Sequence, residues 1–227
     1  NNDFITNDND GLTINATLST QLAPGETLEY SADNGATWSD ISSAVSGTAI
    51  THTDASLTSD ATIQMRVTDS AGNSSIPVEK TITIDTTAPT IASVTLADGT
   101  YKIGDSVALT ITATNNEADL TLSPATFNGQ TLTDITDNGD GSYSATYTVQ
   151  EGDPDLSDGD NATANLAFTD PAGNSGPAFT SVALSGETID ATAPTTTLTI
   201  DSISDDTGSS NNDFITNDND GLTINAT

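Results

Sequence analysis

Residues 61–68 read ATIQMRVT, and this stretch decides the fold class. Ile63, Met65 and Val67 alternate with polar side chains, which is the period of two expected of a strand with one buried face. Three further segments show the same alternation, at 107–113, 143–149 and 164–168. No stretch carries a convincing helical period, so the sequence predicts an all-β fold.

Repeats surround this strand. Two short motifs each recur further along the chain, as TDSAGNS at 68–74 and TDPAGNS at 169–175, and as IDTTAPT at 84–90 and IDATAPT at 189–195. A longer repeat encloses both, because NNDFITNDNDGLTINAT stands at 1–17 and again at 211–227. The chain therefore contains two related kinds of unit, type A and type B, of roughly 105 residues, a length that suits an immunoglobulin-like sandwich of about seven strands.

The Ala-Pro pairs mark the predicted boundaries of these units. We expect type A without its first strand at 1–88, type B at 89–193, and the first strands of an incomplete second type A unit at 194–227. The strands expected in type A are 12–19, 27–31, 37–42, 48–53, 61–68 and 78–84. Those expected in type B are 91–97, 107–114, 120–122, 131–136, 143–149, 162–169 and 179–184. The predicted fold class is tandem immunoglobulin-like β-sandwiches arranged end to end.

The last segment raises a question of its own. Two strands alone are marginal in water. We therefore expect residues 194–227 to be ordered only by pairing with another chain or by crystal contacts, and a closed domain formed by this segment alone would refute that expectation. The chain also reads as an internal slice of something larger, because residue 1 does not begin a signal peptide.

Charge and composition exclude several functions. The chain has 33 acidic and 3 basic residues, for a formal charge of −30. Nucleic acid is excluded as a partner because phosphate binding needs Lys and Arg, and an anionic membrane surface is excluded for the same reason. No apolar run is long enough for membrane insertion. The absence of Cys excludes disulfides and thiolate metal sites, and the single His52 excludes zinc sites built on several histidines.

Carboxylates gather where an immunoglobulin-like topology places the ends of the units. Loop AB (3–10 in type A, 98–105 in type B), loop EF (54–60 and 151–161) and the end of strand G (Asp85 and Asp190) are expected at the lower end of a unit. Loop FG (69–73 and 170–174) is expected at the upper end. For type A the lower end carries Asp3, Asp8, Asp10, Asp60 and Asp85, which face Asp170 and Asn174 of the type B FG loop. The lower end of type B carries Asp98, Asp105, Asp153, Asp155, Asp158 and Asp190.

Oxygen ligands without nitrogen or sulfur match Ca²⁺, which takes six to eight oxygens in flexible geometry. The sequence therefore predicts Ca²⁺ at the linkers, above all at the junction 85–90. The alternative is that Asp, Asn and Gly simply form turns and that the acidic surface keeps the protein soluble.

Four motifs together carry a family resemblance. TAPT at the starts of units, DDTGSSNNDFITND after the first strand, TDxAGNS before the last, and DNGDGSYSATYTV resemble the tandem immunoglobulin-like extender repeats of giant bacterial adhesins. These are the biofilm-associated and RTX-type adhesins exported by type I secretion. The resemblance covers essentially the whole chain and implies extender domains with Ca²⁺ at their linkers. It also implies the usual ligands of that family, the linker Asp before TAP, which are Asp85 and Asp190, with Asp170 beside the first.

The resulting hypothesis is a non-catalytic extender (stalk) segment of a large bacterial surface adhesin. Ca²⁺ at the linkers would make it rigid, and a distal region would bind a ligand in adhesion or biofilm formation. Its predicted partners are the neighbouring repeats of the same polypeptide, with strand pairing to another chain through 194–227. The alternative is a module that itself binds glycan or ice, for which Thr195–Thr199 supply a threonine array, although outward Thr is common in strands.

One octet points to an enzyme. SADNGATW at 31–38 resembles the Asp-box of sialidases and related β-propellers. A sialidase-like site needs several arginines, whereas this chain has Arg66 alone, and Ser-His-Asp catalysis would have to use His52 on a predicted strand. We therefore interpret the octet as the turn of a hairpin that joins 27–31 to 37–42, and we predict no catalytic residues.

Overall fold

The structure is a computed structural model that describes residues 3–204, 206, 210, 213–217 and 219–226. The chain divides into two compact units, Asn1–Ala191 and Thr192–Thr227. In the described part the helical segments are two 3₁₀ turns, η1 (Ser42–Ala44) and η2 (Thr114–Asn116). The all-β prediction is thus confirmed. No helix of the described residues has the length and apolar character needed to span a membrane.

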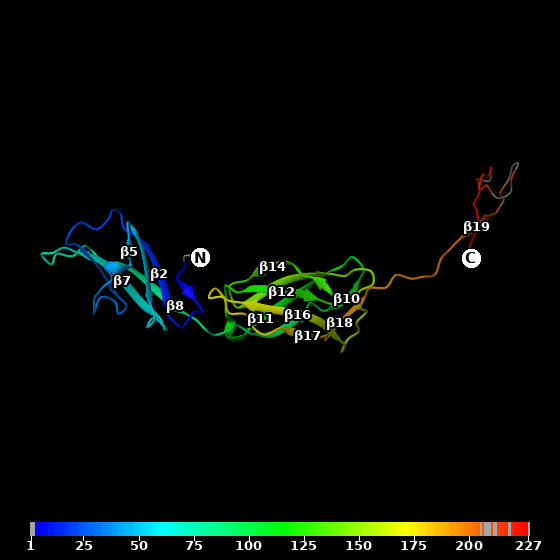
Figure 1. Ribbon diagram of the computed structural model, residues 1–227. Helices are drawn as coiled ribbons and strands as arrows, with labels where there is room; N and C mark the ends of the chain where they lie inside the picture. Colours follow the sequence, from blue (N-terminus) through cyan, green and yellow to red (C-terminus); the bar gives the residue numbers. More distant parts are fainter. Residues whose placement is uncertain (1–2, 205, 207–209, 211–212, 218, 227) are drawn as a thin grey trace. The chain divides into compact units, whose positions relative to one another are not determined.

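Residues 5–84 form two sheets, with strand orders β1-β8-β7-β3-β4 and β2-β6-β5 (Figure 1). The strands are β1 (Ile5–Thr6), β2 (Leu12–Thr17), β3 (Thr27–Ser31), β4 (Ser39–Asp40), β5 (Val45–Ser46), β6 (Ala49–Asp54), β7 (Ala61–Thr68) and β8 (Val78–Ile84). The strands predicted at 27–31, 61–68 and 78–84 are confirmed to the residue. Ile63 of β7 is buried, as its alternation predicts.

Besides the unpredicted β5 and shifts of one or two residues at the ends of β2 and β6, two features of this region differ from the prediction. The strand expected at 37–42 is only β4, because Ser42 donates from its N–H and its hydroxyl to Asp40 Oδ1, at 2.8 and 2.6 Å. Those bonds close a turn that leads into η1. The second difference is β1, which pairs in parallel with β8 and places Ile5 opposite Thr83. Two residues are too few to show a period of two, so no sequence pattern predicted β1.

Residues 91–190 form two four-stranded sheets, β14-β15-β11-β9 and β13-β12-β16-β17, and a two-stranded sheet, β10-β18. The strands are β9 (Ile91–Leu96), β10 (Gly99–Lys102), β11 (Ser106–Ala113), β12 (Thr121–Phe127), β13 (Gln130–Thr131), β14 (Thr133–Asp137), β15 (Ser142–Thr148), β16 (Asn161–Thr169), β17 (Phe179–Ala183) and β18 (Glu187–Asp190). The predicted strand 131–136 is therefore two strands, and β12 is longer than the predicted 120–122.

The pair β10 and β18 was absent from the sequence prediction. It is parallel and places Tyr101 opposite Ile189. The last strand, expected at 179–184, ends at Ala183, and the chain resumes as β18 after Gly186 at φ 109°. Both parallel pairs, β1 with β8 and β10 with β18, attach a short early segment to the final strand of its own region.

The buried hydrophobic side chains form two separate clusters. One gathers residues between 28 and 82, including Leu28, Tyr30 and Ile63. The other gathers residues between 94 and 191, including Tyr143 and Tyr147. The boundary predicted between 88 and 89 falls between the two clusters.

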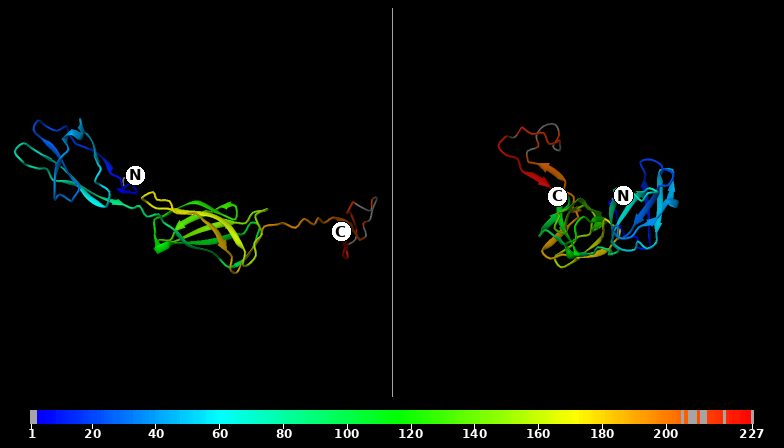
Figure 2. Two further views of the ribbon diagram at one scale, coloured as in Figure 1. Left: turned by 60° about the horizontal axis from the view of Figure 1, so that its bottom comes forward. Right: turned by 90° about the vertical axis from the view of Figure 1, so that its left-hand side faces the viewer.

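Residues 192–226 contain two described strands, β19 (Ile200–Ile203) and β20 (Ile224–Ala226), which pair antiparallel. Figure 2 shows the chain between β18 and β19 drawn without strand arrows. The threonine array at 195–199, on which the alternative of a glycan- or ice-binding module rested, therefore lies outside any strand. The apolar side chains of this segment stay in solvent, with Leu198 72% and Ile200 56% exposed. Among the described residues of this segment β19 and β20 form a two-stranded sheet, and the expected pairing with another chain stays a prediction.

Candidate functional site

The first residue of the linker that follows β8 is held on two sides. This residue, Asp85, donates its N–H to the Thr6 carbonyl at 2.9 Å, next to β1. The Asp85 carbonyl in turn accepts the Asn174 side-chain amide at 2.7 Å. The Asp85 carboxylate accepts the Thr87 N–H at 2.8 Å, which folds the linker into a local turn. Asp85 is thus joined both to the strand pair β1–β8 and to the FG loop of type B.

The FG loop owes its shape to the motif TDPAGNS. Both oxygens of Asp170 accept bonds from Asn174, one from its N–H and one from its amide, each at 2.8 Å. Asp170 is only 6% exposed. The copy of the motif in type A makes the same loop, because Asp69 accepts the N–H and the amide of Asn73, also at 2.8 Å. Equal sequence therefore yields equal geometry in the two loops.

Close packing fixes the rest of the linker. A Cβ added to Gly176 would fall on the carbonyl oxygen of buried Pro89, so only glycine allows this approach. Thr90 bonds to Thr114 twice, since its carbonyl accepts the Thr114 N–H at 2.9 Å and its hydroxyl donates to the Thr114 hydroxyl at 2.7 Å. The linker thereby lies against both the FG loop and the η2 segment.

The η2 segment brings in Glu117, a residue that the sequence prediction missed. Its carbonyl accepts the Tyr143 hydroxyl at 3.4 Å, and that hydroxyl accepts the Leu120 N–H at 2.8 Å. Burial raises the pKa of the Glu117 carboxyl, and the charges of Asp170 and Asp85 raise it further. The carboxylates of Asp170 and Asp85, from distant parts of the sequence, therefore repel that of Glu117 near the linker. No sequence pattern pointed to Glu117, because it lies in none of the motifs that repeat between type A and type B.

This arrangement offers oxygen donors of the kind that a hard divalent cation accepts. The donor chemistry suits Ca²⁺, but the side chains of the described residues are not gathered: no group of three or more His, Cys, Asp or Glu among them stands ready to hold a metal. Asp170 already directs both oxygens to Asn174. The predicted juxtaposition of Asp85, Asp170 and Asn174 is present, and their role as ligands stays a prediction.

The other carboxylates predicted at the lower end of type A serve local bonds. Asp3 Oδ1 accepts the Ile5 N–H at 3.2 Å, and Asp60 Oδ1 accepts the Ile84 N–H at 2.7 Å at the end of β8. Asp8 Oδ1 accepts the Asp10 N–H at 3.2 Å, and hydrogen bonding with Asp8 together with its charge raises the pKa of Asp10. The Asp3 and Asp8 bonds are those of local turns, and the Asp60 bond ties the loop before β7 to the end of β8. The structure thus adds weight to the alternative that these residues shape loops.

At the lower end of type B the predicted carboxylates tie the EF loop to β18 and its approach. Asp155 Oδ1 accepts the Ala191 N–H at 2.7 Å, and Asp158 Oδ1 accepts the Gly186 N–H at 2.9 Å. Asp98 lies beside the same glycine, since a Cβ there would stand 3.2 Å from Asp98 Oδ1. Asp190 ends β18 opposite Lys102 in the β10–β18 pair.

Two members of this group have protein partners that oppose metal binding. Asp105 forms an ion pair with Lys102, at 2.7 Å between Oδ1 and Nζ. Asp153 is 7% exposed and accepts three bonds, from the Tyr147 hydroxyl at 2.7 Å, the Gln150 N–H at 2.9 Å and the Gln130 amide at 2.6 Å. Burial raises the pKa of Tyr147, and the bond to Asp153 raises it further. Asp153 thus acts as a structural anchor of the EF loop.

The octet 31–38 forms the predicted hairpin between β3 and β4, with Tyr30 opposite Ser39. Asp33 accepts the Thr37 N–H at 2.8 Å and the Thr37 hydroxyl at 2.6 Å, and the Trp38 indole donates to the Gly35 carbonyl at 3.0 Å. Asn34 and Gly35 take positive φ values of 56° and 83°, as the turn requires. These bonds give Asp33, Gly35, Thr37 and Trp38 of the Asp-box resemblance a structural part in the hairpin.

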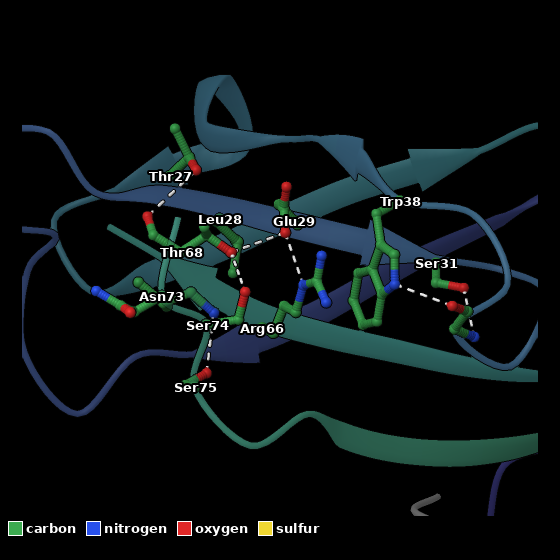
Figure 3. A network of polar contacts seen from close by, with 12 residues as sticks. Thr27, Leu28, Glu29, Ser31, Trp38, Arg66, Thr68, Asn73, Ser74 and Ser75 are labelled. Atoms are coloured by element: carbon green, nitrogen blue, oxygen red, sulfur yellow. Dashed lines mark hydrogen bonds and ion pairs between the residues drawn. The ribbon is translucent and has the colours of Figure 1, made fainter. Parts of the chain in front are cut away.

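Arg66 and His52, the residues considered for catalysis, contact other side chains. Figure 3 shows Arg66 between Glu29 and the Trp38 ring, with Nε 2.7 Å from Glu29 Oε2 and the guanidinium carbon 3.9 Å from the ring centroid. Thr68 donates to the same Glu29 oxygen at 2.8 Å. His52 packs its ring against Tyr30, with 4.7 Å between the ring centroids.

Comparison with known proteins agrees with this architecture. Residues 85–185 match the family model of the bacterial Ig-like domain. The match begins at Asp85, so it includes the linker. No curated protein sequence matches the chain.

Several solved structures are similar to this chain at low identity. The fibronectin(III)-like modules of Clostridium thermocellum CbhA are 13% identical over 77% of this chain and 86% of that chain, with a TM-score of 0.41. The I9–I11 tandem of titin is 18% identical over 82% and 62%, with a TM-score of 0.30. The Bacteroides ovatus protein SGBP-B, solved with a mixed-linkage heptasaccharide, is 18% identical over 80% and 42%, with a TM-score of 0.24.

Proposed function

We propose that this chain is a non-catalytic extender segment of a large bacterial surface adhesin, in which immunoglobulin-like units follow one another and carry a distal ligand-binding region. The observation that carries the proposal is the bond from the Asn174 amide to the Asp85 carbonyl, at 2.7 Å. It joins the end of the last type A strand to the FG loop of type B. A stalk needs such a joint, because a free linker would let successive units swing independently.

The repeated motif supports the same proposal. Asp69 and Asn73 make the loop that Asp170 and Asn174 make, so type A presents an equivalent amide. Asn73 would hold the linker of a preceding type B unit, at the carbonyl that corresponds to Asp190. Each unit would then carry both halves of the joint, which suits a tandem array of any length.

We further propose that Ca²⁺ binds at this linker through Asp85, Asp170 and Glu117. Their donor atoms suit the ion, and the raised pKa of Glu117 indicates repulsion that a divalent cation would offset. With few ligands the dissociation constant would be on the order of 10⁻⁴–10⁻³ M, the range of extracellular modules. The bound ion would stiffen the linker, and Asp190 would have the equivalent role after type B.

Small-angle X-ray scattering with Ca²⁺ and with EDTA tests the proposal. At a concentration where light scattering reports a monomer, we expect Ca²⁺ to increase the maximum dimension and chelation to decrease it, while circular dichroism shows folded sandwiches in both. Asp85→Asn should lose most of the response, and Glu79→Gln, which removes an exposed charge on β8, should keep it. A wild-type maximum dimension that is the same in Ca²⁺ and in EDTA would refute the stiffening role.

An extracellular, cell-surface location and a role in adhesion or biofilm formation belong to the same proposal. The bacterial Ig-like match supports a surface role. Export by type I secretion rests on the family resemblance alone. The absence of catalysis is supported by the engagement of Arg66 with Glu29 and of His52 with Tyr30.

A further inference from the structure

In the type B region, a strand near the start pairs with the last strand. β9 and β10 follow the linker, and β18 ends the region. β10 and β18 lie side by side as a parallel pair over their whole length, beginning with Gly99 opposite Glu187 (Figure 1). The Thr188 hydroxyl also donates to the Thr100 hydroxyl at 3.0 Å. The stretch of chain that enters this region is thus bonded directly to the stretch that leaves it.

The EF loop holds β18 along its other edge. Leu156 and Ile189 exchange backbone bonds, at 2.9 Å from the Leu156 N–H and at 2.8 Å from the Ile189 N–H. The carboxylates of Asp155 and Asp158 accept the backbone N–H groups just after and just before β18, at 2.7 and 2.9 Å. β18 therefore has bonds along both of its edges, and the Ile189 side chain within it is buried.

The direction of the two strands decides how this pair responds to tension. Tension along the chain pulls the start of β10 toward the linker and pulls the end of β18 in the opposite sense. Because the strands are parallel, these two pulls act at opposite ends of the pair and slide one strand along the other. The evenly spaced bonds of a parallel pair then carry the load together. A pull at the same end of both strands would instead break the bonds one after another.

We propose that β18, held between β10 and the EF loop, is the load-bearing element of the type B unit, and that Asp155 and Asp158 are the latch that fastens it. The type A region follows the same plan, since β1 pairs in parallel with β8 and the Asp60 carboxylate accepts the Ile84 N–H at 2.7 Å.

The use of this resistance in a stalk under tension rests on the proposed function. The resistance itself belongs to residues 99–191 and needs no Ca²⁺, because hydrogen bonds within that range supply it. It gives two carboxylates that the sequence predicted as Ca²⁺ ligands a mechanical role at the lower end of type B.

Single-molecule pulling of the whole chain in EDTA tests the direction of loading. The chain has no Cys, so a pair of introduced cysteines supplies the only handles. Ala97→Cys with Thr195→Cys pulls the start of β10 against the end of β18, whereas Ile103→Cys with Thr195→Cys pulls both strands from the same end. All three replaced side chains are exposed. We expect a several-fold higher unfolding force from the first pair, and equal forces from the two pairs would overturn the proposal.

Two matched variants test the latch with the first pair of handles. Asp155→Ala with Asp158→Ala removes two bonds to backbone N–H groups beside β18. Asp137→Ala is the control, because it also removes two such bonds, from Asp119 and Gly139 at 2.7 and 2.8 Å, away from β18. Forced unfolding depends on the unfolding rate and not on the equilibrium free energy. We therefore expect both variants to lose similar stability in urea and only the double variant to unfold at a lower force.

The results separate the load-bearing strand from the proposed function. A double variant that keeps the wild-type unfolding force, or a control that loses as much force, would overturn the latch. The comparison of handles leaves β18 and the EF loop unchanged, so it decides the load-bearing role even if the double variant does not fold. Because the forces are measured in EDTA, a maximum dimension that does not respond to Ca²⁺ would leave them unchanged.

Discussion

Asp33 shows how one residue shapes a hairpin. Its carboxylate accepts bonds from the Thr37 hydroxyl, the Thr37 N–H and the Ser31 hydroxyl, at 2.6, 2.8 and 2.7 Å. These donors favour the ionised form. The Thr37 hydroxyl bond is the main reason that the pKa of Asp33 falls to about 2 from an ordinary value of 3.8. The Asp-box-like sequence of this chain is therefore one that forms a turn.

Asp33→Ala should lower the thermal unfolding midpoint at neutral pH. A depressed pKa means that the ionised carboxylate stabilises the fold above pH 3.8 and that this contribution fades as the pH falls through about 2. The gap between the variant and the wild type should therefore close in that window. Circular dichroism melting curves across the acid range measure it, with Glu79→Ala as the control. A gap that is unchanged at the lowest pH would contradict the pKa of Asp33.

Glu117→Gln should raise the unfolding midpoint at neutral pH in EDTA. The pKa of Glu117 is raised, so its neutral form favours folding at low pH and its ionisation costs stability as the pH rises through the folded value. The amide removes that cost, and the gain should vanish at about pH 4. Addition of Ca²⁺ should raise the unfolding midpoint of the wild type and leave that of the variant unchanged. Glu79→Gln serves as the control. A difference in midpoint between Glu117→Gln and the wild type that changes with neither pH nor Ca²⁺ would argue against repulsion at the linker.

At the scale of elements, the linker works as a joint because three features meet on it. The FG loop supplies Asn174, the η2 segment supplies the Thr114 bonds, and β9 begins at Ile91, just after Pro89 and Thr90. The contacts that Asn174 and Thr114 make with the linker are not local in sequence. The joint is therefore a property of the folded type B unit, which receives the end of β8.

Gly176→Ala tests that joint. Its Cβ would overlap the Pro89 carbonyl, a backbone atom that cannot turn aside, so we expect a loss of roughly 1–3 kcal/mol in the free energy of unfolding. Gly99→Ala is the matched control, because its Cβ would meet the Tyr101 side chain at 3.1 Å, which can shift. Neither glycine has a positive φ that would add backbone strain. Urea unfolding of both variants gives the comparison, and equal losses would mean that the contact with Pro89 is unimportant.

At the scale of the whole molecule, the dominant quantity is charge. The formal charge is −30, and the chain has three cationic side chains. Arg66 pairs with Glu29, Lys102 pairs with Asp105, and Lys80 lies over the Phe4 ring at 5.2 Å from its centroid. The protein thus offsets little of its own charge, and cations from solution must offset the rest. The predicted response of the maximum dimension to Ca²⁺ belongs to this scale, since a stiff linker needs its local repulsion removed.

The sequence by itself determined the fold class, the strands β3, β7 and β8, the hairpin at 31–38 and the paired FG loops. These features depend on alternation and on turn residues within a few positions of one another, which a sequence displays directly. Only the tertiary structure decided that β1 joins β8, that β10 joins β18, that the charges of Asp85 and Asp170 act on Glu117, and that β2 borders a groove. Those contacts join distant segments, and closure of the sandwich brings such segments together in ways that no local pattern encodes.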